Sequence, residues 1–220
     1  MSPYSSRRYG AVAGHWQQNV RSLLHAAATF MRSEQPAMYG HVHPHGHATS
    51  KLSRSFAAAL VRDRAAHSHL LDEVELGAYL HDIGKYLIAK SILLKPGPLS
   101  AEERAAVSLH PAYGAEIIRG LVGVTNTVYR VVLYHHERWD GQGYPCGIAG
   151  ERIPFVARVV AVCDVYTALR TRRSYKPSLS RREATAVLEE MAGRELDPDM
   201  VRDFVRLLAP ERHGRAGRRC

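Results

Sequence analysis

The chain has 220 residues, of which 45% are hydrophobic, and carries a formal charge of +9. This length suits one domain of ordinary size, and the hydrophobic content excludes a chain that is disordered throughout. We find no apolar run long enough to cross a membrane and no signal-peptide pattern in the polar, basic start from Met1 to Gly10, so we expect a cytoplasmic protein. The positive charge would attract an anionic substrate, although its concentration near the C-terminus also fits a solvated tail.

Helical periodicity dominates the first half of the chain. Apolar residues recur at helical spacing in residues 15–32, and residues 33–46 follow as a break rich in Pro, Gly and His. The same spacing predicts helices for residues 48–66 and 72–88.

The second half is also predicted to be helical. Ser100 and Ser180 each begin a capping box, which predicts a new helix after each of them, the second over 184–193. Further helices are predicted for residues 128–136, 155–170 and 199–209. Alternating strand patterns are scarce, so the sequence predicts an all-α fold. We expect one compact domain at 46–209, between an N-terminal helix and His-rich linker at 1–45 and a basic tail at 210–220.

Two carboxylates fall within apolar helical segments. Asp82 follows His81 near the end of one predicted helix, where a charged group is costly unless it is paired or bound to a metal. Lys85 shares that helical face, so an Asp–Lys ion pair is the simpler interpretation. Asp164 lies in a segment that is apolar on nearly every side, and an ion pair with Arg158 is the alternative to a metal there.

Histidines gather in three other places. His135 and His136 are adjacent and lead through a carboxylate into an Asp-Gly-x-Gly-Tyr-Pro loop. His110 precedes a proline, and by itself fits a capping histidine. His47 follows His41, His43 and His45, and the alternative for this segment is a disordered loop that binds metals loosely.

Taken together, these side chains predict a metal centre. Imidazole and carboxylate are ligands for borderline and hard metal ions. The three cysteines have no CxxC spacing, so the sequence suggests neither a disulfide framework nor a thiolate zinc site. One metal rarely needs seven side chains, whereas two metals sharing a carboxylate would use them and keep positions for water and substrate. The candidate ligands are His47, His81, Asp82, His110, His135, His136 and Asp164.

In this order, the motifs resemble those of the HD-GYP family of bacterial cyclic dinucleotide phosphodiesterases, a branch of the HD phosphohydrolase superfamily. The resemblance extends over most of residues 47–209. Its most specific part is the loop that ends at Tyr144-Pro145, after His135-His136. It implies an HD-domain-like helical bundle with a dinuclear metal centre that hydrolyses cyclic di-GMP to pGpG, and onward to GMP.

The resemblance also implies roles for single residues. All seven candidate ligands would bind metal, with Asp82 as the bridging ligand, and Lys85 would contact the scissile phosphate. Iron or manganese is the expected metal, with zinc and nickel as alternatives. The residues expected to border or contact the substrate are Lys85, Gly143, Tyr144, Pro145, Arg173 and Lys176.

Two departures bear on the number of metals. Some family members place a glutamate four residues before the first ligand histidine, where it helps to hold a third metal, and this chain has His43 there. Thr167 stands where the family commonly has a second aspartate. Both departures favour a two-metal centre.

Two other functions stay open. One is hydrolysis of another nucleotide, such as pGpG or cyclic GMP-AMP, because the ligands do not select the substrate. The other is a non-catalytic module that binds diguanylate cyclases through the Tyr144 loop. We also expect that the chain can form a homodimer.

Overall fold

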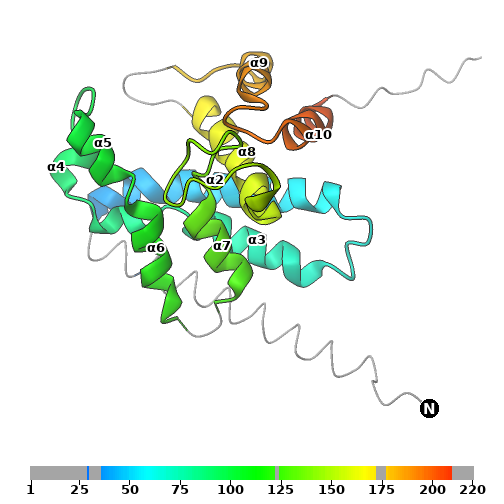
Figure 1. Ribbon diagram of the computed structural model, residues 1–220, viewed down its shortest axis with the longest axis horizontal. Helices are drawn as coiled ribbons and strands as arrows, with labels where there is room; N and C mark the ends of the chain where they lie inside the picture. Colours follow the sequence, from blue (N-terminus) through cyan, green and yellow to red (C-terminus); the bar gives the residue numbers. More distant parts are fainter. Residues whose placement is uncertain (1–28, 30–35, 122–123, 172–176, 210–220) are drawn as a thin grey trace, which may run out of the picture.

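A computed structural model describes residues 29, 36–121, 124–171 and 177–209 of the chain. Every regular element in these ranges is helical, which confirms the predicted all-α fold (Figure 1). None of the described helices is long and apolar enough to span a membrane. The elements in chain order are α2 (Pro36–Leu60), α3 (Ser68–Leu80), η1 (Ile83–Leu87), α4 (Lys90–Leu93), α5 (Ala101–Val107), α6 (His110–Arg119), α7 (Asn126–Tyr134), η2 (Gly150–Arg152), α8 (Phe155–Arg170), α9 (Arg181–Met191) and α10 (Pro198–Leu208).

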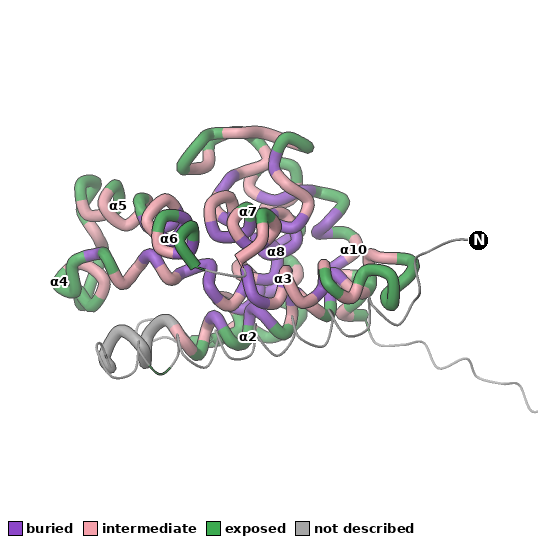
Figure 2. The backbone as a smooth tube through the Cα atoms, turned by 90° about the horizontal axis from the view of Figure 1, so that it is seen from below, coloured by how far each residue is buried: buried purple, intermediate pink, exposed green. Residues whose placement is uncertain are grey.

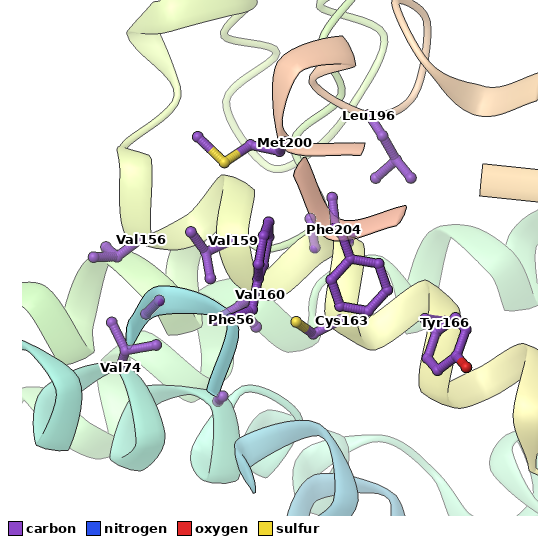
Figure 3. Packing of buried hydrophobic residues seen from close by; sticks show 14 of the residues in the cluster. Phe56, Val74, Val156, Val159, Val160, Cys163, Tyr166, Leu196, Met200 and Phe204 are labelled. Carbon is purple, nitrogen blue, oxygen red and sulfur yellow. The ribbon is translucent and has the colours of Figure 1, made fainter. Parts of the chain in front are cut away.

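Helix α8 forms the centre of the main core. It is apolar on nearly every side and packs against α2, α7, α9 and α10. Figure 3 shows Phe56 of α2 and Phe204 of α10 beside Cys163 of α8, and the two phenylalanine rings meet edge to face at 5.0 Å. The predicted helix over 155–170 is therefore confirmed, and Asp164 lies on the most enclosed helix of the fold.

A smaller core joins α3, α6 and α7. Leu76 and Leu80 of α3 pack with Ile118 of α6 and with Val128 and Val132 of α7. Figure 2 shows the buried residues concentrated where α3, α7 and α8 lie together, whereas α4 and α5 at the edge are largely intermediate or exposed.

The predicted break at 33–46 is wrong for residues 36–46, which are helical, while residues 33–35 lie outside the described part of the chain. Helix α2 begins at Pro36 and runs to Leu60 with Pro44 inside it. A Cβ atom on Gly46 would lie 2.9 Å from the carbonyl oxygen of Tyr79, so glycine lets α2 approach the end of α3 closely. Packing against α3 and α8 thus overrides the poor helix propensity of this segment.

This helix also crosses the domain limit predicted at residue 46. The limits of the three predicted domains stay a prediction, and nearly all of the helix expected over 15–32 lies outside the described residues. Both predicted capping boxes are confirmed: the side chains of Ser100 and Ser180 each accept a hydrogen bond from the backbone three residues on, at Glu103 and Glu183.

The single helix predicted over 72–88 is divided in the structure. Helix α3 ends at Leu80, and the 3₁₀ helix η1 begins at Ile83. A Cβ atom on Gly84 would lie 1.9 Å from the carbonyl oxygen of His110, so only glycine allows η1 to meet the start of α6 at this distance. His81 and Asp82 consequently lie at a helix junction that faces α6.

Candidate metal centre

His81 is fully buried at the end of α3, and its ring orientation is determined by the backbone. Its Nδ1 atom lies 2.7 Å from the carbonyl oxygen of Ala78, so Nδ1 donates a hydrogen bond to that oxygen. The Nε2 atom is buried and has no hydrogen-bond partner. Orienting one ring nitrogen through a backbone carbonyl is the usual way in which proteins present the other nitrogen to a metal.

His110 and His135 repeat this arrangement at other helix ends. The Nδ1 atom of His110 lies 2.7 Å from the carbonyl oxygen of Val107, and that of His135 lies 2.9 Å from the carbonyl oxygen of Val132. Both imidazoles are buried. Three histidines therefore use the carbonyl three residues before them to direct Nε2 inward.

One group of potential ligands gathers around His110. Ligand atoms of Asp82, His110, His135 and His136 all lie within 4.8 Å of one another. The Nε2 atom of His110 lies 3.2 Å from Oδ1 of Asp82 and 3.3 Å from Nε2 of His135. The adjacent histidines both point into this group because they follow the end of α7, and their rings lie 4.2 Å apart.

A second group joins α2, α3 and α8. It consists of His45, His81 and Asp164, whose ligand atoms also lie within 4.8 Å of one another. The Oδ1 atom of Asp164 lies 2.6 Å from Nε2 of His45 and 3.5 Å from Nε2 of His81. Within the described residues, this group and the one around His110 bring together six of the seven predicted ligands and add His45.

The predicted position of His47 is wrong. His47 is exposed, and its ring stacks beside that of His43 with centroids 6.3 Å apart, outside both ligand groups. Residues two apart on an α-helix point about 200° from each other, so His45 and His47 cannot face the same site. Because α2 is a helix there and not a loop, His45 takes the place expected for His47.

Asp82 lies between the two groups and is almost fully buried. Its Oδ1 atom faces His110 at 3.2 Å, and its Oδ2 atom faces His81 at 3.4 Å. The Nζ atom of Lys85 donates a hydrogen bond to Oδ2 at 2.6 Å. The ion pair considered as the simpler interpretation is therefore present, together with a carboxylate that faces both ligand groups.

Opposing effects act on the protonation of these groups. Burial lowers the pKa of His81, but the neighbouring carboxylates of Asp82 and Asp164 raise it to about 10. Burial lowers the pKa of His136 to about 3 and holds that of His135 well below its usual value. Burial would raise the pKa of Asp82, but the charges of Lys85 and His81 hold it well below its usual value. At neutral pH the metal-free site thus encloses anionic carboxylates, a protonated His81 and the neutral imidazoles of His135 and His136.

The residues present fit divalent metal ions. Nε2 of His81 and Oδ1 of Asp82 are buried without a hydrogen-bond partner, which is costly unless another group binds them. The potential ligand atoms of the two groups are all imidazole nitrogens or carboxylate oxygens, and no thiolate is among them. The structure also overturns the alternative for Asp164, because Arg158 forms its ion pair with the buried Asp197, at 2.5 Å.

The loop after the paired histidines covers this centre. The backbone N–H of Tyr144 donates a hydrogen bond to the carbonyl oxygen of His136, and the two rings lie 5.0 Å apart. A Cβ atom on Gly143 would lie 2.3 Å from the backbone nitrogen of Arg138, so glycine is required for this close approach. Pro145 is exposed, whereas Arg173 and Lys176 lie outside the described residues.

A family model for the HD domain matches residues 29–200. The chain belongs to the HD domain family. The match extends over both ligand groups and the Tyr144 loop, in agreement with the resemblance inferred from the motifs.

Curated relatives of this HD domain include bacterial phosphodiesterases. The chain is 43% identical over 134 residues to the cyclic di-GMP phosphodiesterase response regulator RpfG of Xanthomonas campestris, with 60% of this chain and 35% of that protein covered. It is 38% identical over 149 residues to the 3′3′-cGAMP-specific phosphodiesterase 2 of Vibrio cholerae, with 65% of this chain and 28% of that protein covered. The HD domain therefore spans about a third of the length of these relatives.

A solved structure shares the fold. The HDG"Y"P protein Bd1817 of Bdellovibrio bacteriovorus superposes with a TM-score of 0.61 at 19% identity, over 89% of this chain and 69% of that chain. This likeness confirms the predicted HD-type helical bundle.

Two residues of this HD domain were not predicted as part of the site. His45 was considered only as part of a loop that binds metals loosely, although helical i, i+4 spacing would have placed His45 and Thr49 on one face. Glu137 also had no predicted role, and it is buried with both carboxylate oxygens bound to the loop backbone. Its place directly after two ligand histidines was the available signal.

Proposed function

We propose that this HD domain is a metal-dependent phosphodiesterase that hydrolyses cyclic di-GMP to pGpG, and onward to GMP. One observation carries the proposal: two groups of nitrogen and oxygen ligands lie next to each other, and the Asp82 carboxylate of the first group also faces His81 of the second. Relatives named as cyclic di-GMP phosphodiesterases support the substrate. The activity of such an enzyme would lower the level of this bacterial second messenger in the cytoplasm.

The two groups would each hold a divalent cation. Asp82, His110, His135 and His136 would hold one, and His45, His81 and Asp164 the other, with Asp82 as the shared ligand. Bound divalent cations would activate a water molecule and offset negative charge on the phosphoryl group. Because backbone carbonyls already orient His81, His110 and His135, these rings need little rearrangement before they bind.

Lys85 would act on the phosphate. Its side chain is partly exposed, and its ammonium group lies 2.6 Å from Oδ2 of the buried Asp82. An ammonium group is a flexible point charge, so it can leave Asp82 for a phosphate oxygen once other cations neutralise the carboxylate. There it would offset the charge that develops as the phosphorus–oxygen bond breaks.

The Tyr144 loop would border the substrate. Tyr144 bonds to the backbone of His136 and its ring lies 5.0 Å from the His136 ring, which supports substrate contacts by Tyr144 and its neighbours Gly143 and Pro145. Arg173 and Lys176 are proposed as further contacts to the dinucleotide. Diguanylate cyclases are proposed as partners of the exposed part of this loop.

Iron or manganese is the proposed metal, with zinc and nickel as alternatives that accept the same ligands. His43 lies outside both groups, with its ring edge to face on Tyr79 at 5.3 Å. This position supports two metals per chain.

Cyclic GMP-AMP is a second candidate substrate, because relatives at 38% identity are named as 3′3′-cGAMP-specific phosphodiesterases. Anaerobically purified protein with measured metal content should be assayed against cyclic di-GMP, 3′3′-cGAMP and pGpG. We expect cyclic di-GMP to have the highest kcat/KM and a chelator to abolish turnover. A preference for 3′3′-cGAMP would select the second candidate. Absence of hydrolysis by the metal-loaded protein would favour the non-catalytic alternative.

A further inference from the structure

Glu137 is a buried carboxylate that the ligand groups do not use. Only 4% of the residue is exposed, and its neighbours His135 and His136 both belong to the first ligand group. The exclusion of Glu137 from that group has a structural cause, because its two oxygens are already bound elsewhere. Oε1 accepts a hydrogen bond from the backbone N–H of Cys146 at 2.7 Å, and Oε2 accepts one from Ile148 at 3.0 Å.

These two bonds close the loop that follows the histidines. The amides of Cys146 and Ile148 lie on either side of Gly147, whose φ of +63° belongs to the left-handed region. The same loop has a further attachment two residues before Cys146, where the Tyr144 N–H donates a hydrogen bond to the carbonyl oxygen of His136. Tyr144 is therefore bonded directly to the turn after α7, two residues before the first amide that bonds to Glu137, and the acceptors His136 and Glu137 are consecutive residues of that turn.

Among the described residues, no lysine or arginine bonds to Glu137. The two backbone amides are therefore the main groups that offset the cost of burying its carboxylate. Hydrogen bonds to an ionised acceptor are stronger than those between neutral groups, and they are strongest away from water. A glutamine in this position would offer one oxygen and one N–H₂ group to two N–H donors. It would therefore keep one of the bonds and oppose the other.

We propose that Glu137 is a positioning residue that holds the Tyr144 loop over the metal centre and thereby determines how tightly the enzyme binds its substrate. The turn after α7 directs His135 and His136 into the first ligand group and Glu137 towards the loop. One segment therefore sets the distance between that ligand group and the loop. The effect on substrate rests on the proposed function. The effect on the loop does not.

The test compares metal-loaded wild-type protein with the variants Glu137→Gln and Glu137→Asp. The matched control is Glu151→Gln, which changes an exposed carboxylate at the end of the same loop. Four quantities are measured: metal content, hydrogen exchange of residues 141–149, and the KM and the kcat for cyclic di-GMP. Circular dichroism verifies that each variant is folded, and Glu137→Asp, which keeps the charge but shortens its reach, decides the matter if the glutamine variant does not fold.

In Glu137→Gln we expect unchanged metal content, loop exchange faster by roughly tenfold or more, and a KM raised by a similar factor with a smaller change in kcat, as for the loss of one hydrogen bond to a charged group. The control should match the wild type. A loss of metal would overturn the proposal and make Glu137 a ligand. Unchanged hydrogen exchange of the loop would also overturn the proposal, because Glu137 would then not hold the loop. Faster exchange with an unchanged KM would overturn the link to substrate. If the wild-type protein hydrolyses no dinucleotide, the proposed function fails, while exchange and metal content still decide whether Glu137 holds the loop.

Discussion

The Nε2 atom of His45 lies 2.6 Å from Oδ1 of Asp164, although 119 residues separate them in the chain. The contact joins α2 to α8 directly beside His81, the ligand at the end of α3. It depends on Gly46, because a side chain there would press on the backbone of Tyr79 and move α2 away. The second ligand group therefore exists only when the three helices pack together.

His45 and His47 form a matched pair of histidines for mutation. His45→Ala should lower the metal content from about two per chain to about one, because the second group would keep only His81 and Asp164. His47→Ala should leave metal content and turnover near those of the wild type, since His47 is exposed. Inductively coupled plasma mass spectrometry of the anaerobically purified variants measures this. The reverse result, with metal lost only in His47→Ala, would contradict the assignment of His45.

Asp82→Ala should remove metal and activity together. Among the described residues, Asp82 is the carboxylate that faces ligands of both groups, and water cannot replace its charge in a buried site. Metal analysis and a cyclic di-GMP hydrolysis assay on the same preparation test this expectation. Full hydrolysis by a metal-free Asp82→Ala protein would falsify the two-metal mechanism.

Lys85→Ala should separate turnover from metal binding. Lys85 contacts Asp82 without being a ligand, so the metal content should stay near that of the wild type. Turnover should fall by roughly 10²-fold or more, the scale for losing one preorganised electrostatic contact. Single-turnover assays with measured metal content distinguish the two effects. If the variant loses its metal, Lys85 serves mainly to hold Asp82.

Metal binding should release protons. The carboxylates of Asp82 and Asp164 outweigh burial and raise the pKa of His81 to about 10, so this imidazole is protonated in the metal-free protein at neutral pH. A metal binds only the form that lacks the Nε2 proton, so its affinity should increase as the pH rises from about 7 towards 10. Calorimetry of the chelator-treated protein in buffers of different ionisation enthalpy measures the released protons. A pH-independent affinity would contradict this protonation state.

Gly84→Ala should disrupt the junction that brings His110 to Asp82. The new methyl group would lie 1.9 Å from the His110 carbonyl oxygen, a backbone atom that cannot move without shifting α6. We expect a loss of about 3 kcal/mol or more in unfolding free energy, together with weaker metal binding. Gly120→Ala is the control, because nothing lies within 4 Å of its added Cβ atom. Chemical denaturation of both variants provides the measurement, and equal stability would show that α6 can yield.

The local sequence was sufficient to predict most of this site. His81-Asp82 and His135-His136 are adjacent pairs, so any helix end that directs one residue inward also brings the other close. The apolar segment around Asp164 predicted a buried helix, and burial of a carboxylate implies a partner. The capping boxes at Ser100 and Ser180 involve only near neighbours, and both were confirmed.

Tertiary structure alone decided which histidine of α2 faces the site and where Glu137 points. The Pro, Gly and His residues of this segment predicted a break, but burial against α3 and α8 makes it helical, and the helical phase then selects His45 over His47. The pairing of Arg158 with Asp197 rather than Asp164 has the same origin, since it depends on where α10 begins relative to α8. Contacts between residues far apart in the chain follow from the packing of whole helices, and propensity and spacing within one segment do not contain that information.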